Sequence, residues 1–128
     1  MSVEANKRLA LHFLDDMSAR GAGTFADFSL ITEDFIWWAQ SLGTYDAPAM
    51  IKRMGQVGQI FAGKGQRTIK GVTAEGDRVV VEYTGDTPLT NGQRYQNTYL
   101  SLFVIRDGRV ATVREYCDTG YARDTLRA

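Results

Sequence analysis

The sequence has only one cysteine, Cys117, and one histidine, His12, among its 128 residues. A lone cysteine cannot form a disulfide bond within the chain, which fits a reducing compartment or a protein that is indifferent to redox conditions. Zinc sites of the usual kind need several cysteine or histidine ligands, so a site of that kind is nearly excluded. A glycine-rich dinucleotide fingerprint is missing too, and we therefore expect no metal or other cofactor.

An excess of one charge is also missing, because 15 acidic residues balance 15 basic ones. Without surplus positive charge the chain is poorly suited to a phosphate backbone, so we expect no nucleic-acid partner. No segment approaches the roughly 18 apolar residues of a membrane span, and residues 1–14 lack the apolar core of a signal peptide. These absences predict a cytoplasmic protein with no membrane partner, and the length fits a single domain over 1–128.

Apolar side chains recur at helical spacing in the first half of the chain. They predict a helix over residues 3–19, a shorter helix capped by Thr24, and a third helix over 47–62. The aromatic run at 35–38 predicts a strand between the second helix and the third.

After residue 66 the apolar pattern changes to a period of two, which is typical of strands. Strands are predicted at 66–74, 77–87, 93–106 and 109–118. Asn-Gly and Asp-Gly pairs favour tight hairpins, and turn pairs lie at Gly76-Asp77, Asn91-Gly92 and Asp107-Gly108. Helices followed by an antiparallel meander predict an α+β fold, with the helices packed on one face of a curled sheet.

Pairing through the hairpins predicts which side chains share a face of this sheet. A two-residue turn at Asp107-Gly108 places Glu115 opposite Leu100, and a loop centred on Asn91 places Glu82 opposite Leu100. The face that the helices cover then carries Glu82, Thr84, Leu100, Val113, Glu115 and Cys117. A β-bulge within 93–106 would reverse part of this assignment.

The opposite face is expected to be an interface between two copies of the chain. It carries large side chains that no other segment is left to cover, namely Tyr83, Tyr99, Phe103, Arg114 and Tyr116. Exposed aromatic surface of this size usually marks an interface. We therefore expect a homodimer built sheet to sheet.

Glu82 and Glu115 are the two carboxylates expected in the hollow under the helices, about 10 Å apart across two strand spacings. An apolar hollow raises the pKa of a carboxyl, which would let one group act as general acid and the other as base. The alternative is that each is paired with an Arg or Tyr or lies at a solvated rim. Trp37 or Trp38 is expected to line the hollow, and Cys117 is expected to be a buried thiol rather than a nucleophile.

Four segments carry a family resemblance, at 76–82, 92–97, 103–110 and 114–119. They resemble the SnoaL-like branch of the nuclear transport factor 2-like superfamily, which includes polyketide cyclases, ketosteroid isomerase and limonene-1,2-epoxide hydrolase. The closing Arg-Glu-Tyr-x-Asp-Thr, which follows an Asp-Gly hairpin, is fairly specific. The resemblance implies a cone-shaped curved sheet around a hydrophobic pocket, about three N-terminal helices that close it, and commonly a dimer.

The catalytic residues of these relatives are mostly replaced in this sequence. The resemblance to the epoxide hydrolase places its last-strand Asp on Glu115, its Arg on Glu82 and its second Asp on Thr84. Its Tyr falls on Trp37, and the oxyanion-hole Tyr of ketosteroid isomerase falls on Phe13. The resemblance therefore implies a pocket, keeps one acid at Glu115, and leaves the reaction open.

These observations favour a protein that holds a small hydrophobic molecule and acts on it as a lyase, isomerase or cyclase. Glu115 is the expected base, Glu82 its partner acid, and Thr84 a hydrogen-bonding group. The remaining expected substrate-binding residues are Phe13, Trp37, Leu100, Val113 and Cys117. A binding protein without turnover is the main alternative, and an epoxide hydrolase with a rebuilt water site is a third reading.

Overall fold

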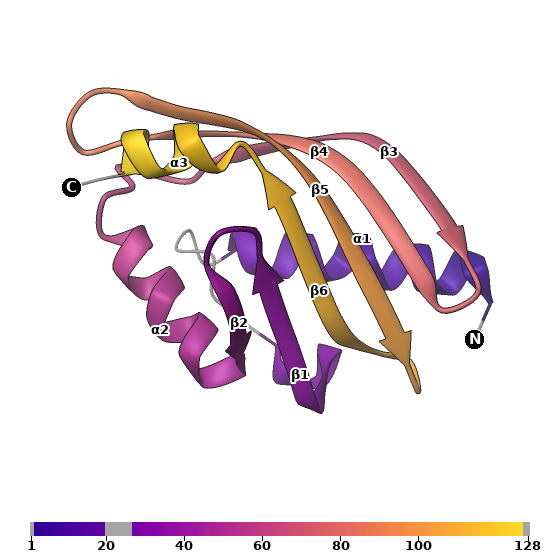
Figure 1. The fold of residues 1–128 in the computed structure, drawn as a ribbon. Helices are drawn as coiled ribbons and strands as arrows, with labels where there is room; N and C mark the ends of the chain where they lie inside the picture. Colours follow the sequence, from indigo (N-terminus) through magenta and orange to yellow (C-terminus); the bar gives the residue numbers. More distant parts are fainter. Residues whose placement is uncertain (1, 20–26, 127–128) are drawn as a thin grey trace.

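The centre of the molecule is a curved, open sheet of six strands in the order β2-β1-β6-β5-β4-β3 (Figure 1). The computed structural model describes residues 2–19 and 27–126. Its strands are β1 (Ile31–Ala39), β2 (Gly43–Asp46), β3 (Gln66–Glu75), β4 (Arg78–Pro88), β5 (Arg94–Arg106) and β6 (Arg109–Cys117). Neighbouring strands are antiparallel except β1 and β6, which run parallel.

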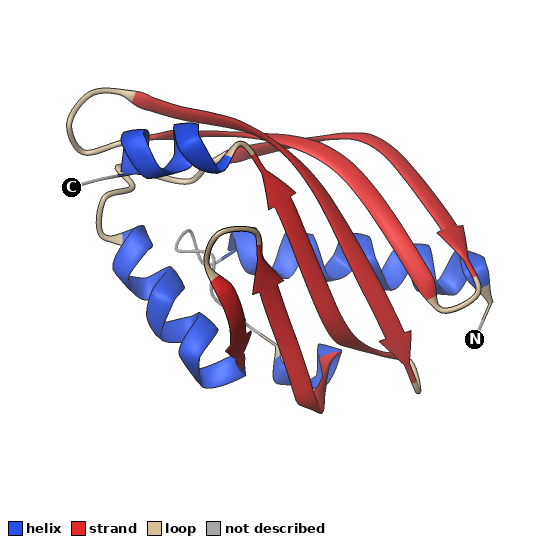
Figure 2. Ribbon diagram, viewed as in Figure 1, coloured by secondary structure: helices blue, strands red, loops and turns tan. Residues whose placement is uncertain are grey.

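The helices lie on one side of this sheet (Figure 2). They are α1 (Val3–Ala19), the 3₁₀ helix η1 (Phe28–Leu30), α2 (Ala47–Gly58) and α3 (Thr119–Leu126). Helix α1 crosses the strands, whereas α2 and α3 lie toward one end of the sheet (Figure 1). The start of α2 is fixed by Asp46, whose Oδ1 accepts a hydrogen bond from the Ala49 N–H at 2.9 Å.

The predicted α+β class is confirmed, and so are the helix over 3–19 and the four strands after residue 66. The expected cap at Thr24 lies outside the described residues. Strand β2 and helix α3 were not predicted, because β2 has only four residues and α3 follows the last predicted strand, which ends at residue 118. The pairing of β1 with β6 makes the sheet mixed rather than purely antiparallel.

The turn at Asp107-Gly108 has the predicted geometry. Arg106 pairs with Arg109, and both turn residues have positive φ, 53° at Asp107 and 74° at Gly108, as a two-residue type I′ hairpin requires. The loop around Asn91 is longer and joins Pro88 to Arg94.

A β-bulge follows the tight hairpin and changes the register of β6. Ile105 pairs with Val110, but Val104 pairs with Thr112, so Ala111 is an extra residue in β6. Glu115 consequently lies opposite Ser101 rather than opposite Leu100.

The bulge overturns the predicted division of the sheet into faces. Glu82 does lie opposite Leu100, as predicted, but both lie on the face away from Glu115. Tyr83, Tyr99 and Phe103 were predicted on the face that forms a dimer interface. They lie instead on the concave face, which the helices cover. An error of one residue in register moves every later side chain to the other face, which explains the exchange.

The core lies between the helices and the concave face. Phe13 of α1 is fully buried and meets the ring of Phe103 edge-on, with ring centroids 5.8 Å apart. The ring centroid of Phe35, on β1, lies 6.0 Å from that of Phe13. This packing fills one end of the concave face, and the other end remains hollow.

Candidate functional site

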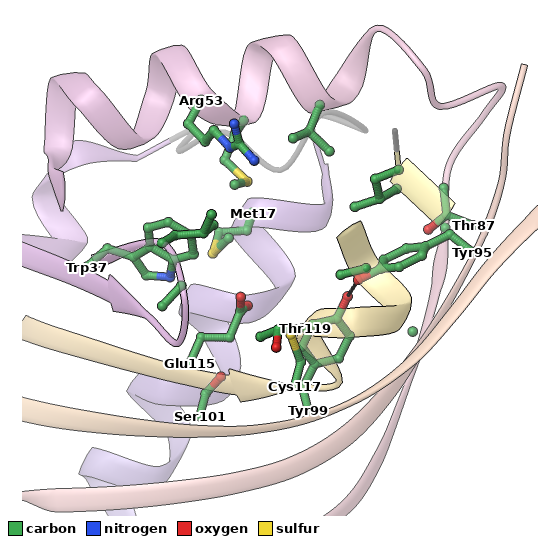
Figure 3. Close-up of a pocket in the computed structure, with 18 of the residues that line it drawn as sticks. Met17, Trp37, Arg53, Thr87, Tyr95, Tyr99, Ser101, Glu115, Cys117 and Thr119 are labelled. Carbon is green, nitrogen blue, oxygen red and sulfur yellow. Dashed lines mark hydrogen bonds between the residues drawn. The ribbon is translucent and has the colours of Figure 1, made fainter. Parts of the chain in front are cut away.

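A cavity of about 640 Å³ occupies the space between the concave face and the three α-helices. Its walls are mainly apolar, with Met17 from α1, Trp37 from β1, and Met54 and Val57 from α2. Figure 3 shows Met17 and Trp37 on one side of the space and Tyr95 and Thr87 on the other. The volume suits a small organic molecule.

Glu115 projects from β6 into this cavity (Figure 3). Burial raises the pKa of its carboxyl to about 7, and the positive charge of Arg67 partly opposes that rise. Within the described part of the chain, the Glu115 carboxyl has neither an ion-pair partner nor a hydrogen bond. The carboxyl therefore titrates much closer to neutral pH than an ordinary glutamate, and it is accessible from the cavity.

Tyr95 and Tyr99 place a pair of hydroxyl groups on the wall beside Glu115. The Tyr99 hydroxyl donates to the Tyr95 hydroxyl at 3.1 Å, and Asn97 Nδ2 donates to the same oxygen at 2.8 Å. The oxygen of Tyr95 thus accepts two hydrogen bonds, which leaves its own hydrogen for a group inside the cavity. Burial raises the pKa of Tyr95 and raises that of Tyr99 well above its usual value, so both hydroxyls stay protonated at neutral pH.

Tyr83 and Ser101 form the floor next to Glu115. Their hydroxyl oxygens are 2.9 Å apart, and the Tyr83 ring stacks on Tyr99 with centroids 5.0 Å apart. Burial raises the pKa of Tyr83, and the nearby Glu115 raises it further. This floor is rigid and remains uncharged.

Cys117 also lines the cavity. It lies two residues after Glu115 on β6, so both side chains are on the same face of the strand. Burial raises the pKa of its thiol to about 11, and the charge of Glu115 adds to the rise. The thiol is therefore protonated at neutral pH, and its environment is the opposite of one that activates a nucleophile.

Three arginines reach the cavity from different elements. Arg67 of β3 donates from Nη1 to the Leu14 carbonyl at 2.7 Å and lies 5.3 Å above the Tyr83 ring. Arg123 of α3 pairs with Asp124 at 3.0 Å. Arg53 projects from α2.

The structure places five of the eight predicted site residues on the cavity. They are Phe13, Trp37, Val113, Glu115 and Cys117. Glu82, Thr84 and Leu100 are not among its lining residues; they lie on the convex face, and the bulge in β6 brings Glu115 to the opposite, concave face. Glu82 is exposed there, and Leu100 is 44% exposed. The expected pair of carboxylates in one hollow is therefore wrong.

Sequence reasoning missed Arg53, Arg67, Tyr95 and Tyr99. Arg53 left a usable signal, because it lies three residues after Met50 and interrupts the apolar stripe of the predicted helix. Tyr95 and Tyr99 lie four residues apart on β5, so their side chains share a face, as strand alternation predicts. The register error between β5 and β6 assigned Tyr99 to the wrong face. Arg67 left no signal beyond its place at the start of a strand.

Residues 2–19 and 27–126 contain no group of three or more His, Cys, Asp or Glu side chains placed to hold a metal ion. Over the same residues, no helix is long and apolar enough to cross a membrane.

The fold and its cavity define a class, the nuclear transport factor 2-like proteins with a helix-covered pocket in a curved α+β cone. The SnoaL-like domain model matches residues 10–113, most of the chain. The chain therefore belongs to the SnoaL-like family. No curated protein matches the sequence.

Solved structures share the fold at low sequence identity. An NTF2-like protein of unknown function from Burkholderia pseudomallei K96243 has a TM-score of 0.81 and 18% identity, over 100% of both chains. TerC, co-crystallized with polyporic acid, has a TM-score of 0.79 and 18% identity, over 97% of this chain and 99% of its own. An LEH-like epoxide hydrolase from M. tuberculosis has a TM-score of 0.73 and 16% identity, over 97% and 90% respectively.

Proposed function

We propose that this protein is an enzyme of the lyase, isomerase or cyclase kind, which moves a proton on a small apolar molecule bound in the cavity. The observation that carries the proposal is Glu115, an unpaired carboxyl in an apolar cavity with its pKa raised to about 7. General acid/base catalysis is most efficient when the pKa of the group lies near the working pH. A buried charge without a partner is also costly, and such groups are concentrated at functional sites.

The proposed step is the removal of a proton from a carbon next to a carbonyl group. The ionised Glu115 oxygen accepts the proton, the C–H bond breaks, and its electron pair moves toward the carbonyl oxygen. The hydroxyl of Tyr95 donates a hydrogen bond to that oxygen as negative charge develops on it. Glu115 then gives the proton to another atom of the substrate, or to a leaving group that departs with the electron pair of its broken bond, so Glu115 is ionised again and the atoms balance without a cofactor.

The comparisons support a pocket for a small molecule. The family match and the similar folds of a polyporic acid complex and an epoxide hydrolase are consistent with one. Neither the ligand nor the reaction carries over at this identity, so the chemistry rests on the side chains of this chain.

A binding protein without turnover is the second candidate. The observation that favours it is the position of Glu82, which is exposed on the convex face and cannot serve as a second acid in the cavity. An Asp-Arg-Asp set of the epoxide hydrolase kind is not assembled either, because Thr84 lies on that face as well.

Hydrogen exchange at carbon separates these two functions. 2-Tetralone is an apolar ketone with acidic C–H bonds, and its exchange in D₂O can be followed by NMR with and without the protein. An enzyme should accelerate the exchange. Glu115→Gln should lower the protein-catalysed rate of exchange at least about 100-fold, and Glu82→Gln should leave that rate unchanged. Binding of 2-tetralone without accelerated exchange would favour the binding protein.

A further inference from the structure

Arg53 is a cation on the cavity side of α2, where an apolar residue is expected. Met50, Met54 and Val57 occupy the same side, and Met50 is 2% exposed. Figure 3 shows the Arg53 side chain extending from α2 toward the cavity, across from Glu115. Among the α2 residues that line the cavity, Met54 and Val57 are apolar, Gln56 is polar and neutral, and Arg53 is the one that carries a charge.

The guanidinium of Arg53 is incompletely satisfied. Its Nε is buried and has no hydrogen-bond partner in the described part of the chain. A buried donor without an acceptor is unfavourable, and native structures rarely keep one without a reason. Because Arg53 lines the cavity, an oxygen of a molecule bound there would supply the missing acceptor.

The charges around the cavity are unbalanced. Among the described residues that line it, four are charged: Arg53, Arg67, Arg123 and Glu115. Arg67 is held by the Leu14 carbonyl and Arg123 by Asp124. Glu115 lies across the cavity and forms no ion pair with Arg53, so it leaves the charge of Arg53 uncompensated.

We propose that the cavity binds an apolar molecule that carries one anionic oxygen group, a carboxylate or an acidic enol, and that Arg53 binds this group. This inference rests on the proposed function for the cavity and adds the class of ligand. The fork of a guanidinium offers Nε–H and Nη–H to two oxygens, which matches a carboxylate better than an ammonium group does. The apolar body of the ligand lies against Met17 and Trp37, and its reacting end faces Glu115.

Two dyes with nearly the same apolar body test this inference. 8-Anilinonaphthalene-1-sulfonate is anionic, and N-phenyl-1-naphthylamine lacks the sulfonate; both fluoresce when they enter an apolar site. Dissociation constants are measured for both dyes with the intact protein, with Arg53→Met and with Arg53→Lys. Lys52→Met is the matched control, because Lys52 is exposed on α2 and does not line the cavity.

We expect Arg53→Met to weaken binding of the anionic dye about tenfold, the usual effect of losing a charge-assisted contact, and to change binding of the neutral dye less than about twofold. Arg53→Lys should recover part of the loss because it restores the charge without the fork. Lys52→Met should change neither dye. The thermal midpoint of Arg53→Met should not fall, because methionine suits both the helix and the apolar stripe.

Two results would overturn the inference. Equal losses for both dyes in Arg53→Met would mean that Arg53 shapes the cavity without recognising an anion. Unchanged affinity for the anionic dye would mean that the dye binds elsewhere or that Arg53 does not contact it. Either result leaves the 2-tetralone assay untouched, so failure here can be told apart from failure of the proposed acid/base function.

Discussion

Glu115 differs from the other acidic side chains because its surroundings favour the neutral form. Asp34 and Asp86 lie at the surface, where hydrogen bonds to their ionised forms lower their pKa. Glu115 receives no such bonds, and burial raises its pKa to about 7. The surroundings of a carboxyl therefore set the direction of its pKa shift in this chain, downward at Asp34 and Asp86 and upward at Glu115.

The raised pKa predicts how stability depends on pH. The folded state holds the proton of Glu115 more tightly than the unfolded state, whose pKa is near 4.5. The contribution of Glu115 to stability is therefore fully present below pH 4.5 and is lost as pH rises through about 7, by up to about 3 kcal/mol. Glu115→Gln should remove this loss, so it should be more stable than the wild type at pH 8 and similar to it at pH 4.5 in urea titrations.

Glu82→Gln is the control for that measurement, because Glu82 is exposed on the convex face. Its stability should follow the wild type at every pH. The raised pKa would be contradicted if the free energies of unfolding of Glu115→Gln and the wild type differed by the same amount at pH 4.5 and pH 8.

Tyr95→Phe tests the hydrogen-bond donor of the proposed step. The change removes the hydroxyl that Tyr99 and Asn97 hold in place, so the developing negative charge loses its donor. Exchange of 2-tetralone should slow about 100-fold while its dissociation constant changes little. Tyr116→Phe, which removes a hydroxyl on the convex face, should leave the rate unchanged. An equal effect of both changes would point to general loss of structure.

At the scale of elements, the hairpin before β6 fixes the pairing of Arg106 with Arg109, and the bulge that follows it brings Glu115 to the concave face. Gly108 has a φ of 74°, a backbone conformation that strains residues with a Cβ. Gly108→Ala should lower the free energy of unfolding by about 1 kcal/mol in chemical denaturation. Gly55→Ala in α2 is the contrasting change, because a Cβ there meets nothing within 4 Å, and it should raise stability by a similar amount. Loss of stability in both would contradict the turn argument.

Periodicity explains why the elements could be predicted and their register could not. The spacing of apolar residues over 3–19 and after 66 follows directly from the geometry of helices and strands. The extra residue at Ala111 leaves no mark on the alternation, since Val110 and Ala111 are both apolar and both buried. Glu115 was placed on the helix-covered face correctly, whereas Glu82 was not, because the bulge at Ala111 shifts the pairing of β6 with β5 by one residue.

At the scale of the whole molecule, the convex face remains the predicted interface of a homodimer, with a different set of residues. It presents partly exposed large side chains, namely Trp38, Leu100, Leu102, Arg114 and Tyr116. The Arg114 guanidinium lies 4.0 Å from the centroid of the Trp38 ring. These two side chains of the convex face therefore contact each other within one chain.

Sedimentation at micromolar concentration tests the dimer. The wild type should sediment at twice 14.3 kDa, and Leu100→Asp should sediment as a monomer, because it places a charge in the centre of an apolar contact. Lys52→Asp on α2 should remain dimeric. A monomeric wild type would show that the convex face is open to solvent.

The parallel pairing of β1 with β6 also bears on the order in which the chain folds. It joins an early strand to the last strand, at Ala39 and Glu115, and such distant pairs form slowly because a long loop must close first. The hairpins of β3, β4 and β5 can form before it. The cavity is therefore completed late, and during refolding the fluorescence of an apolar dye should rise with the slowest phase rather than with the first appearance of strands.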